Sequence, residues 1–262
     1  MKRTETKIDP TAYPHALRPI LEDATVYDSS CSPEARVLYV ERDNGYYLKS
    51  APRGTLRREA DMTQYFCGKG LAAEVLYYGS ENERDYLLTS RVMGEDCCDR
   101  QYLDDPKRLS VLLGERLRAL HETAHGDCPV QDRMSTYLAT VEENYRKEQY
   151  DLSYLMDGIS HFTADEAYRY VTAHKGALRN EVLLHGDYCL PNVMLDDWRF
   201  SGFIDLGAGG VGDRHVDLYW GAWTLRFNLG TDAYRERFFD AYGRDLVDEE
   251  KIDLISACEA FG

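Results

Sequence analysis

The first third of the chain contains short runs rich in β-branched, aromatic and other apolar residues between polar segments, a pattern typical of strands. Three stretches carry it: RVLYVERDNGYYLKS (36–50), AEVLYYGS (73–80) and DYLLTSRVMG (85–94). In the first, Asn44-Gly45 stands between two β-rich runs, and because both residue types tolerate positive φ we expect a hairpin there. Between the strands, residues 55–66 repeat apolar positions at helical spacing. Residues 1–95 are therefore predicted to form a mostly antiparallel sheet interrupted by one helix.

From about residue 105 the apolar positions repeat at the spacing of helices. Asp105 is placed to cap the first of these helices, and Pro106 suits its first turn. Further helical patterns cover 134–151, 163–178, 214–229 and 231–242, and a short strand is expected at 202–206. The change of pattern predicts an α+β fold in two lobes, with a small β-rich lobe over residues 1–95 and a larger, mostly helical lobe over 96–262.

The amino-acid composition narrows the classes of protein to which the chain can belong. The 262 residues suffice for a sizeable core, and 44% hydrophobic with 29% charged residues is ordinary for a globular protein. No apolar run reaches the roughly 18 residues of a membrane span, and the first residues lack the apolar segment of a signal peptide, so we expect no membrane partner. The seven cysteines form no regular framework, which favours free thiols in a reducing cytoplasm.

The formal net charge of −15 argues against a nucleic-acid partner, because binding phosphates requires basic patches. Two interpretations of this charge stay open. It can serve solubility alone, or it can form an acidic cleft that attracts a polycationic small molecule.

The stretch LHGDYCLPNVMLDDWRFSGFIDLG (184–207) holds three oxygen donors that suit phosphoryl transfer. Asp187 can accept the proton of an incoming hydroxyl, Asn192 can offer an amide oxygen to Mg²⁺, and the carboxylate of Asp205 can hold magnesium after a predicted strand. Each residue alone also fits an ordinary turn or cap. The three together, in a chain whose β-rich half precedes its helical half, favour a kinase.

A kinase also needs a cation on the phosphates, and Lys49 is the candidate. Lys49 ends the second strand of the hairpin, and Glu59 falls in the helix that follows. A strand lysine paired with a helix glutamate is held against the α- and β-phosphates of the nucleotide. Considered alone, Lys49 would be interpreted as a surface residue of an edge strand.

The chain resembles the aminoglycoside phosphotransferases, specifically the 3′-phosphotransferase (kanamycin kinase) branch, over most of its length. HGDYCLPNVM is similar to the family's catalytic loop, FSGFIDLG to the strand carrying its metal-binding acid, and GDRHVDL to the segment beyond. HETAHGDCP (121–129) and the final EAF also match. The resemblance implies a protein-kinase-like two-lobe fold, ATP or GTP as the donor, Mg²⁺ as the cofactor, and antibiotic resistance through phosphorylation of an aminoglycoside 3′-hydroxyl.

The resemblance also implies roles for single residues. Asp187 would orient or deprotonate the acceptor hydroxyl, Asn192 and Asp205 would hold Mg²⁺, and Lys49 with Glu59 would position the phosphates.

Further nucleotide contacts are implied in the β-rich lobe. Ser32 matches a loop serine near the β-phosphate, and Tyr47 matches an aromatic residue that stacks on adenine, although it fits a core position equally well. The backbone groups of Ser90 and Val92 would bond to adenine. His185, in contrast, is expected to brace the catalytic loop.

One position beside the expected catalytic residues departs from the family pattern. Ala208 stands where family members usually carry an arginine that contacts phosphate or the loop. Its absence should lower turnover, since a group that stabilises the transferring charge can contribute several kcal/mol. Arg214 or Arg226 could take its place.

The acceptor pocket is the least complete part of the match. Family members bind their polyamine substrate with acids, and the matching acids are Asp157, Glu259 and the catalytic Asp187. Phe227 and Cys258 stand where further acids are expected. We therefore expect an altered or weakened drug range.

The sequence is compatible with three functions. The first is Mg²⁺-dependent phosphorylation of an aminoglycoside by ATP or GTP. The second keeps this chemistry but transfers the phosphate to another small hydroxylated metabolite. The third is a nucleotide-binding protein that has lost transfer activity, which Ala208 favours and the retained Lys49, Asp187, Asn192 and Asp205 oppose.

Overall fold

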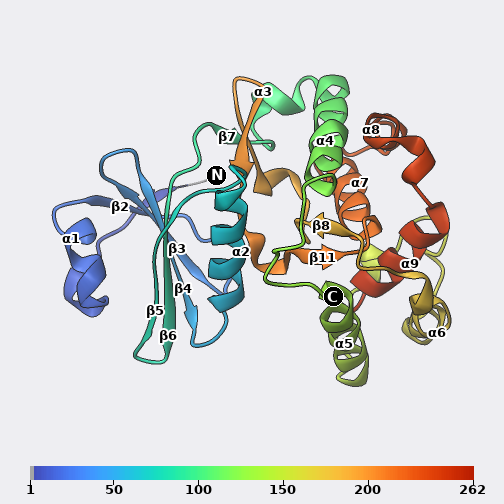
Figure 1. Cartoon of the computed structure of the whole chain (residues 1–262), viewed down its shortest axis with the longest axis horizontal. Coiled ribbons are helices and arrows are strands. Elements are labelled where there is room, and N and C mark those ends of the chain that lie inside the picture. Colours follow the sequence, from blue (N-terminus) through green and yellow to red (C-terminus); the bar gives the residue numbers. More distant parts are fainter. Residues whose placement is uncertain (1–2) are drawn as a thin grey trace. The chain divides into compact units, whose positions relative to one another are not determined.

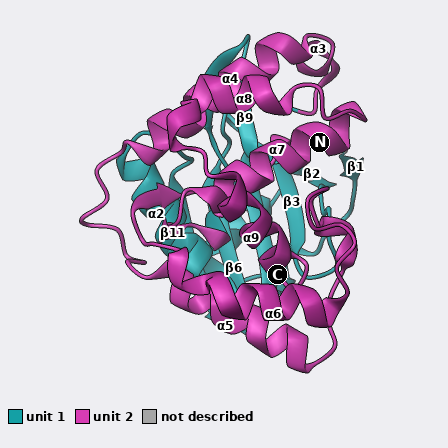
Figure 2. Cartoon of the chain, turned by 90° about the vertical axis from the view of Figure 1, so that its right-hand side faces the viewer, with its two compact units in different colours: residues 1–97, 191–207 teal, residues 98–190, 208–262 magenta. Residues whose placement is uncertain are grey.

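The computed structural model describes residues 3–262 (Figure 1). The chain divides into two compact units: unit 1 comprises residues up to 97 together with 191–207, and unit 2 comprises 98–190 and 208–262 (Figure 2). The sequence pattern placed one boundary between residues 95 and 96 and did not anticipate that 191–207 belong to unit 1. The cause is strand pairing, because β9 (Val193–Asp196) pairs with β7 (Glu95–Asp96).

Unit 1 is built on a six-stranded sheet whose strands follow the order β1-β2-β3-β4-β6-β5, with every neighbouring pair antiparallel (Figure 1). The strands are β1 (Thr4–Glu5), β2 (Thr25–Asp28), β3 (Arg36–Glu41), β4 (Tyr46–Pro52), β5 (Val75–Glu81) and β6 (Arg84–Ser90). The β-rich stretches therefore form strands as predicted. Among the described residues of this unit, the longer helix is α2 (Arg57–Gly68). α1 (Arg18–Leu21) is one turn that follows the 3-10 turns Pro10–Ala12 and His15–Leu17.

The predicted hairpin is the pair β3 and β4, in which Val40 lies opposite Tyr46. Positive φ falls on Asp43 (φ 50°) and Gly45 (φ 92°), so the tight turn differs from a simple Asn-Gly turn. Gly45 is required for a second reason. A Cβ at this position would lie 2.7 Å from the hydroxyl oxygen of Tyr39 on the facing strand.

The alternation of β4 places its side chains on two different faces. Leu48 packs into one core cluster with Leu38 and Leu88, while Ala51 packs into another with Leu56, at the start of α2. Lys49 shares the face of Ala51, because residues two apart on a strand point the same way. The pleat thus directs Lys49 towards α2.

A smaller sheet of unit 1 has the order β10-β9-β7, where β10 is Arg199–Phe203. Phe203 also bridges to Ala72, in the segment between α2 and β5. Gly94 (φ 88°) permits the close approach of β9, since a Cβ there would lie 2.0 Å from the carbonyl oxygen of Leu195. This sheet holds the end of β10, and therefore Asp205, beside the larger sheet of the same unit.

Unit 2 is mostly helical. Its helices are α3 (Arg100–Leu103), α4 (Pro106–His121), α5 (Arg133–Arg146), α6 (Ala164–His174), α7 (His215–Leu229), α8 (Arg235–Tyr242) and α9 (Glu249–Glu259). Asp105 caps α4 by accepting the N–H of Arg108, as the sequence predicted. The pattern did not predict α9, because nearly every residue of its last two turns is buried and no amphipathic stripe results.

A two-stranded antiparallel sheet within unit 2 pairs β8 (Val182–Leu184) with β11 (Gly210–Gly212). The catalytic-loop candidates leave β8 directly, and α7 begins three residues after β11. α7 ends at Gly230, whose φ of 67° is the left-handed conformation that suits a helix end. Within residues 3–262, no helix combines the length and the apolar character that crossing a bilayer requires.

Candidate active site

Two acidic side chains of unit 1 contact the ammonium group of Lys49. Its Nζ lies 2.7 Å from Oε2 of Glu59 and 2.9 Å from Oδ1 of Asp205. Burial would lower the pKa of Lys49, but the two carboxylates outweigh it and the pKa is raised. The lysine is therefore charged at neutral pH. The structure brings together Lys49, Glu59 and Asp205 as a positive centre held between two acids.

Glu59 reaches this position from the first turn of α2, where the helix dipole favours an acid. Its side chain is only 12% exposed, and burial raises the pKa of its carboxyl despite the neighbouring ammonium. Gly207, two residues after Asp205, lies close to α2, and a Cβ there would lie at an ordinary contact distance of 3.5 Å from that of Glu59. The predicted pairing of strand lysine and helix glutamate is thus present in unit 1.

Asp205 and Asn192 are the two metal-ligand candidates, and both belong to unit 1. The N–H of Ile204, next to Asp205, donates to the carbonyl oxygen of Asn192 at 3.1 Å. Asp205 adopts φ 58°, and its side chain is 52% exposed. A half-exposed carboxylate beside an amide residue is a hard oxygen donor set that fits Mg²⁺, which usually keeps waters and phosphate oxygens as its other ligands.

Residues 3–262 contain no group of three or more His, Cys, Asp and Glu side chains arranged to hold a metal ion by themselves.

The other nucleotide candidates also lie in unit 1. Ser32 is exposed in the loop between β2 and β3, and its hydroxyl bonds to the Glu34 carboxylate, which holds the pKa of Glu34 below its usual value. The N–H of Ser90 donates to the carbonyl of Glu74 at 3.0 Å, so this group is already engaged within the sheet. Val92 follows β6 and is buried.

Tyr47 lies on the same face of β4 as Lys49 and is partly buried. Its ring packs against Tyr39 on β3, with the centroids 5.2 Å apart, and its hydroxyl accepts a hydrogen bond of 2.7 Å from Arg3. The Arg3 guanidinium also lies 3.7 Å over the Tyr39 ring. The sequence left open whether Tyr47 is a core residue or an adenine contact. In the structure Tyr47 is partly buried and forms an aromatic pair with Tyr39.

The HGD segment of unit 2 is held by Asp217 of α7. The fully buried carboxylate of Asp217 accepts the backbone N–H of His185 at 2.8 Å and that of Gly186 at 2.7 Å. Gly186 has φ 88°, and the N–H of Asp187 donates to Nδ1 of His185 at 3.3 Å. His185 thus occupies the bracing position that was expected of it, and Asp187 is the partly exposed residue of the three.

Sequence reasoning gave Asp217 no role, although it noted the segment GDRHVDL. Nε2 of His121 lies 3.2 Å from Oδ2 of Asp217, and Nδ1 lies 2.8 Å from the Tyr242 hydroxyl. Burial lowers the pKa of His121 although Asp217 opposes that effect. These residues come from α4, α7 and α8, so only the packed unit reveals that they support one loop.

Glu259, an acceptor-binding candidate, is buried at the end of α9 and makes two hydrogen bonds. Its Oε1 accepts from the Tyr137 hydroxyl at 2.7 Å and from Nε1 of Trp220 at 3.2 Å. Burial raises the pKa of Glu259 to about 7, and the nearby charge of Asp187 contributes to the increase. Asp187 and Glu259 are therefore electrostatic neighbours within unit 2.

Asp157, the other acceptor-binding candidate, is exposed, but it is not an isolated charge. Nη1 of Arg226 lies 2.9 Å from its Oδ1. Phe227, beside Arg226, is 69% exposed.

Both arginines proposed to replace the one absent at Ala208 have acidic partners within unit 2. Arg226 pairs with Asp157, and Nε of Arg214 lies 2.6 Å from Glu181. Instead, Nε of Arg133 donates to the carbonyl oxygen of Ala208 at 2.9 Å. Sequence reasoning missed Arg133, which follows the Asp-Cys-Pro turn that it had matched to the family.

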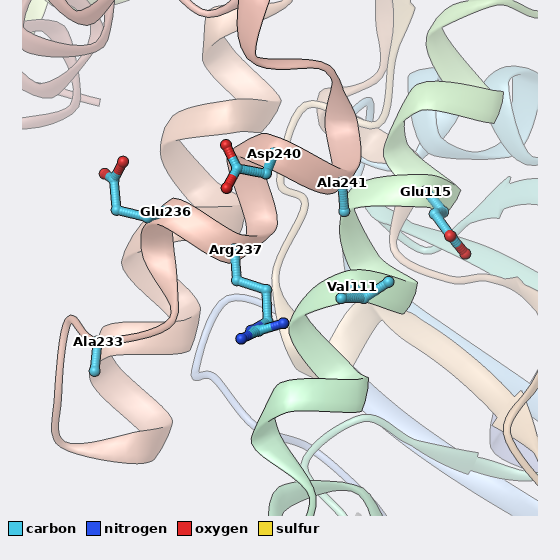
Figure 3. Close-up of a pocket in the computed structure, with 7 residues that line it drawn as sticks. All are labelled: Val111, Glu115, Ala233, Glu236, Arg237, Asp240 and Ala241. Atoms are coloured by element: carbon cyan, nitrogen blue, oxygen red, sulfur yellow. The ribbon is translucent and has the colours of Figure 1, made fainter.

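A hollow between α4 and α8 of unit 2 contains none of these residues. Val111, Glu115, Glu236, Arg237 and Asp240 are among the residues that line it (Figure 3).

Comparison with known proteins identifies the family. The model of the "Phosphotransferase enzyme family" matches residues 33–255. A "Probable aminoglycoside 3'-phosphotransferase" of Lactococcus lactis is 50% identical over 258 residues, which cover 98% of each chain. An aminoglycoside 3'-phosphotransferase of Niallia circulans is 32% identical over 79% of each chain.

A solved structure agrees with this assignment. Aminoglycoside phosphotransferase APH(3'')-Id from Streptomyces rimosus superimposes with a TM-score of 0.79 at 23% identity, covering 97% of this chain and 99% of that chain. Another structure of that protein contains ADP and streptomycin. The fold is therefore the α+β, protein-kinase-like fold of these enzymes, as predicted. The chain belongs to the phosphotransferase enzyme family.

Proposed function

We propose that this protein is an aminoglycoside 3′-phosphotransferase that transfers the γ-phosphate of ATP to a drug hydroxyl and so confers resistance. The observation that carries the proposal is the cluster in which Lys49 lies 2.7 Å from Glu59 and 2.9 Å from Asp205. Such a cation orients nucleotide phosphates, and the second acid suits a metal. The 50% identical relative from Lactococcus lactis supports the choice of acceptor, because it is named a probable aminoglycoside 3'-phosphotransferase.

The chain's own residues divide the work of an in-line transfer. The acceptor oxygen attacks the γ-phosphorus, the bond from that phosphorus to the bridging oxygen breaks, and ADP leaves. The carboxylate of Asp187 accepts the hydroxyl proton. Lys49, steadied by Glu59, holds the α- and β-phosphates. Asn192 and Asp205 would hold Mg²⁺, which neutralises charge on the phosphate oxygens when bound.

The remaining nucleotide contacts follow from unit 1. Tyr47 offers its ring to adenine, and Ser32 lies in the loop that would meet the β-phosphate. The N–H of Ser90 is bonded to Glu74, so its carbonyl is the group left for adenine, with the backbone of Val92 as the second contact. GTP would use the same phosphate contacts.

The acceptor would be bound by Asp157, Asp187 and Glu259. A polycation suits them because each acid can form a charge-assisted hydrogen bond with an ammonium group. The net charge of −15 favours a cationic small molecule over a nucleic acid. All seven cysteines are free thiols, which suits the reducing cytoplasm where ATP is available.

The test is a coupled ADP-release assay with kanamycin, neomycin and a panel of other hydroxylated metabolites, each with ATP and with GTP. Drug-dependent ADP release and a phosphorylated product at the 3′-hydroxyl are expected. Asp187→Asn should reduce kcat by at least about a hundredfold, as expected for loss of a general base. Asp104→Asn, at an exposed acid of unit 2, is the matched control and should retain full activity.

Two results would contradict the proposal. Turnover confined to the metabolite panel would assign the protein to another acceptor. Binding of ATP with Mg²⁺, measured by thermal shift, without transfer to any acceptor would make it a nucleotide-binding protein without transfer activity.

A further inference from the structure

One face of α7 carries aromatic side chains where a surface helix usually carries polar ones. Trp220, Trp223 and Phe227 lie three and four residues apart, so they share this face. The Trp220 and Trp223 ring centroids are 5.4 Å apart, and the Trp223 and Phe227 rings are stacked at 4.9 Å with an interplanar angle of 11°. Tyr154 contacts both tryptophans, with centroids 5.8 and 5.5 Å away. We call these four residues the aromatic ladder.

The aromatic ladder is not core. Phe227 is 69% exposed, and the other three side chains are partly exposed, whereas most other residues of α7 are buried. Leaving a large apolar side chain in water forgoes the roughly 2 kcal/mol that its burial would contribute. A contiguous exposed aromatic surface of this kind marks a binding site more often than a chance feature.

The inner end of the ladder lies beside the catalytic candidate. Trp220 donates its indole N–H to Glu259 at 3.2 Å, in agreement with the packing of α7 against α9. After burial itself, the charge of Asp187 is among the causes that raise the pKa of Glu259 and of the Tyr154 hydroxyl. The rings therefore lead outward from the neighbourhood of Asp187 to the exposed Phe227.

Near Phe227, at the outer end of the ladder, acidic side chains alone would bind a cation weakly. Asp157 is paired with Arg226 at 2.9 Å, so its attraction for an ammonium group is offset. An aromatic ring carries no net charge that Arg226 could neutralise. Its quadrupole still attracts a cation, and its face can also cover the C–H face of a sugar. The occupant that suits both the ladder and the acidic inner end is a sugar ring carrying ammonium groups.

We propose that the aromatic ladder is the subsite for the rings of a cationic aminosugar acceptor that are not phosphorylated, with Phe227 and Trp223 as its outer platform. This inference rests on the proposed function, because it requires an aminoglycoside acceptor. The proposal accounts for Phe227 at a position where an acid was expected. Stacking of the Phe227 ring on the sugar replaces an ion pair between an acid and the substrate ammonium, which the nearby Arg226 would weaken.

The experiment compares the wild type with Phe227→Ala, Phe227→Leu and Phe227→Tyr in steady-state kinetics with kanamycin. Phe227→Ala should raise KM for kanamycin about fivefold, as expected for one lost cation–π and stacking contact, with kcat and KM for ATP unchanged. Phe227→Tyr should restore the wild-type KM, and Phe227→Leu should not. Tyr150→Ala removes another exposed aromatic side chain of unit 2 and should change nothing.

Calorimetric binding of kanamycin without nucleotide separates this inference from the proposed function. If Phe227→Ala weakens binding although the wild type transfers no phosphate, the ladder stands and the proposed function fails. If the wild type phosphorylates kanamycin but Phe227→Ala and the double variant Phe227→Ala/Trp223→Leu keep its KM and affinity, the ladder is overturned and the function stands. A wild type that neither binds nor phosphorylates aminoglycosides would overturn both.

Discussion

The backbone N–H of Gly186 donates a hydrogen bond of 2.7 Å to Oδ1 of Asp217, and the two residues are 31 positions apart in the chain. The neighbouring N–H of His185 donates to the other carboxylate oxygen. A single buried carboxylate therefore determines the path of the backbone immediately before Asp187.

The first prediction concerns Asp217→Asn. The amide has the same shape but offers one acceptor oxygen, so one of the two loop N–H groups would face an NH₂ group. Leaving a buried donor unsatisfied costs about 1–3 kcal/mol. We expect a lower midpoint in thermal unfolding and a kcat reduced at least about tenfold, while KM for ATP stays unchanged. Unchanged kcat in a folded variant would contradict the role given to Asp217.

The second prediction concerns Gly186→Ala. Gly186 has φ 88°, and a Cβ there would lie 2.1 Å from the carbonyl oxygen of Ala208, so the loop would have to move. Strain of this kind costs on the order of 1–3 kcal/mol. We expect loss of activity and a lower unfolding free energy in urea. Gly176→Ala is the control, because nothing lies within 4 Å of a Cβ at that position.

The third prediction concerns pH and His121. Burial lowers the pKa of this imidazole in the folded protein below its ordinary value of 6.5. The unfolded chain therefore binds the proton more readily, and the stabilising contribution, complete above pH 6.5, is lost as pH falls through the folded pKa. Urea unfolding between pH 5 and 8 should show this decline in the wild type. His121→Gln should unfold with a smaller decline below pH 6.5.

The fourth prediction has the opposite sign and concerns Glu259. Its pKa is raised from 4.5 to about 7, so the folded protein binds the proton more readily. The contribution is complete below pH 4.5 and is lost as pH rises through about 7, on the order of 3 kcal/mol in total. Glu259→Gln should remove this dependence and gain stability at pH 8 relative to the wild type. An identical pH profile for both proteins would refute the shift.

The fifth prediction concerns Glu59→Gln. The change removes one of the two acids that hold Lys49, while the side-chain volume is kept. The amide oxygen can still accept a hydrogen bond from the ammonium, but the ion pair is lost, so Lys49 should be held less firmly. We expect kcat/KM for ATP to fall about tenfold, with KM for the acceptor unchanged. Asp61→Asn, two residues further along α2 and paired only with Arg57 on the surface, should retain activity.

Local pattern was enough for most elements of this protein. Runs of β-branched and aromatic residues predicted β3 to β6, and helical spacing with the Asp105 cap predicted α4, because both signals depend on neighbours within a few residues. It failed for α9, whose buried surroundings erase the amphipathic stripe, and for 191–207, whose membership of unit 1 depends on pairing with β7.

Motifs also predicted the pair of Lys49 and Glu59, because a strand face and the first turn of the next helix are close in the chain. Sequence reasoning missed Asp217, His121 and Arg133, whose partners lie 31 to 96 positions away. It offered Asp157 as an acid for the acceptor and did not anticipate the pairing of Asp157 with Arg226.

The amino-acid sequence by itself determined the family and the residue types that perform the chemistry, since a lysine, an amide and two carboxylates must be present for any phosphoryl transfer of this kind. Only the tertiary structure decided the electrostatic state of those groups. Whether an acid is paired, as Asp157 is with Arg226, or buried with a raised pKa, as Glu259 is, depends on what packs against it. Coulombic and desolvation energies vary with distance and burial in space, and separation along the chain does not specify either.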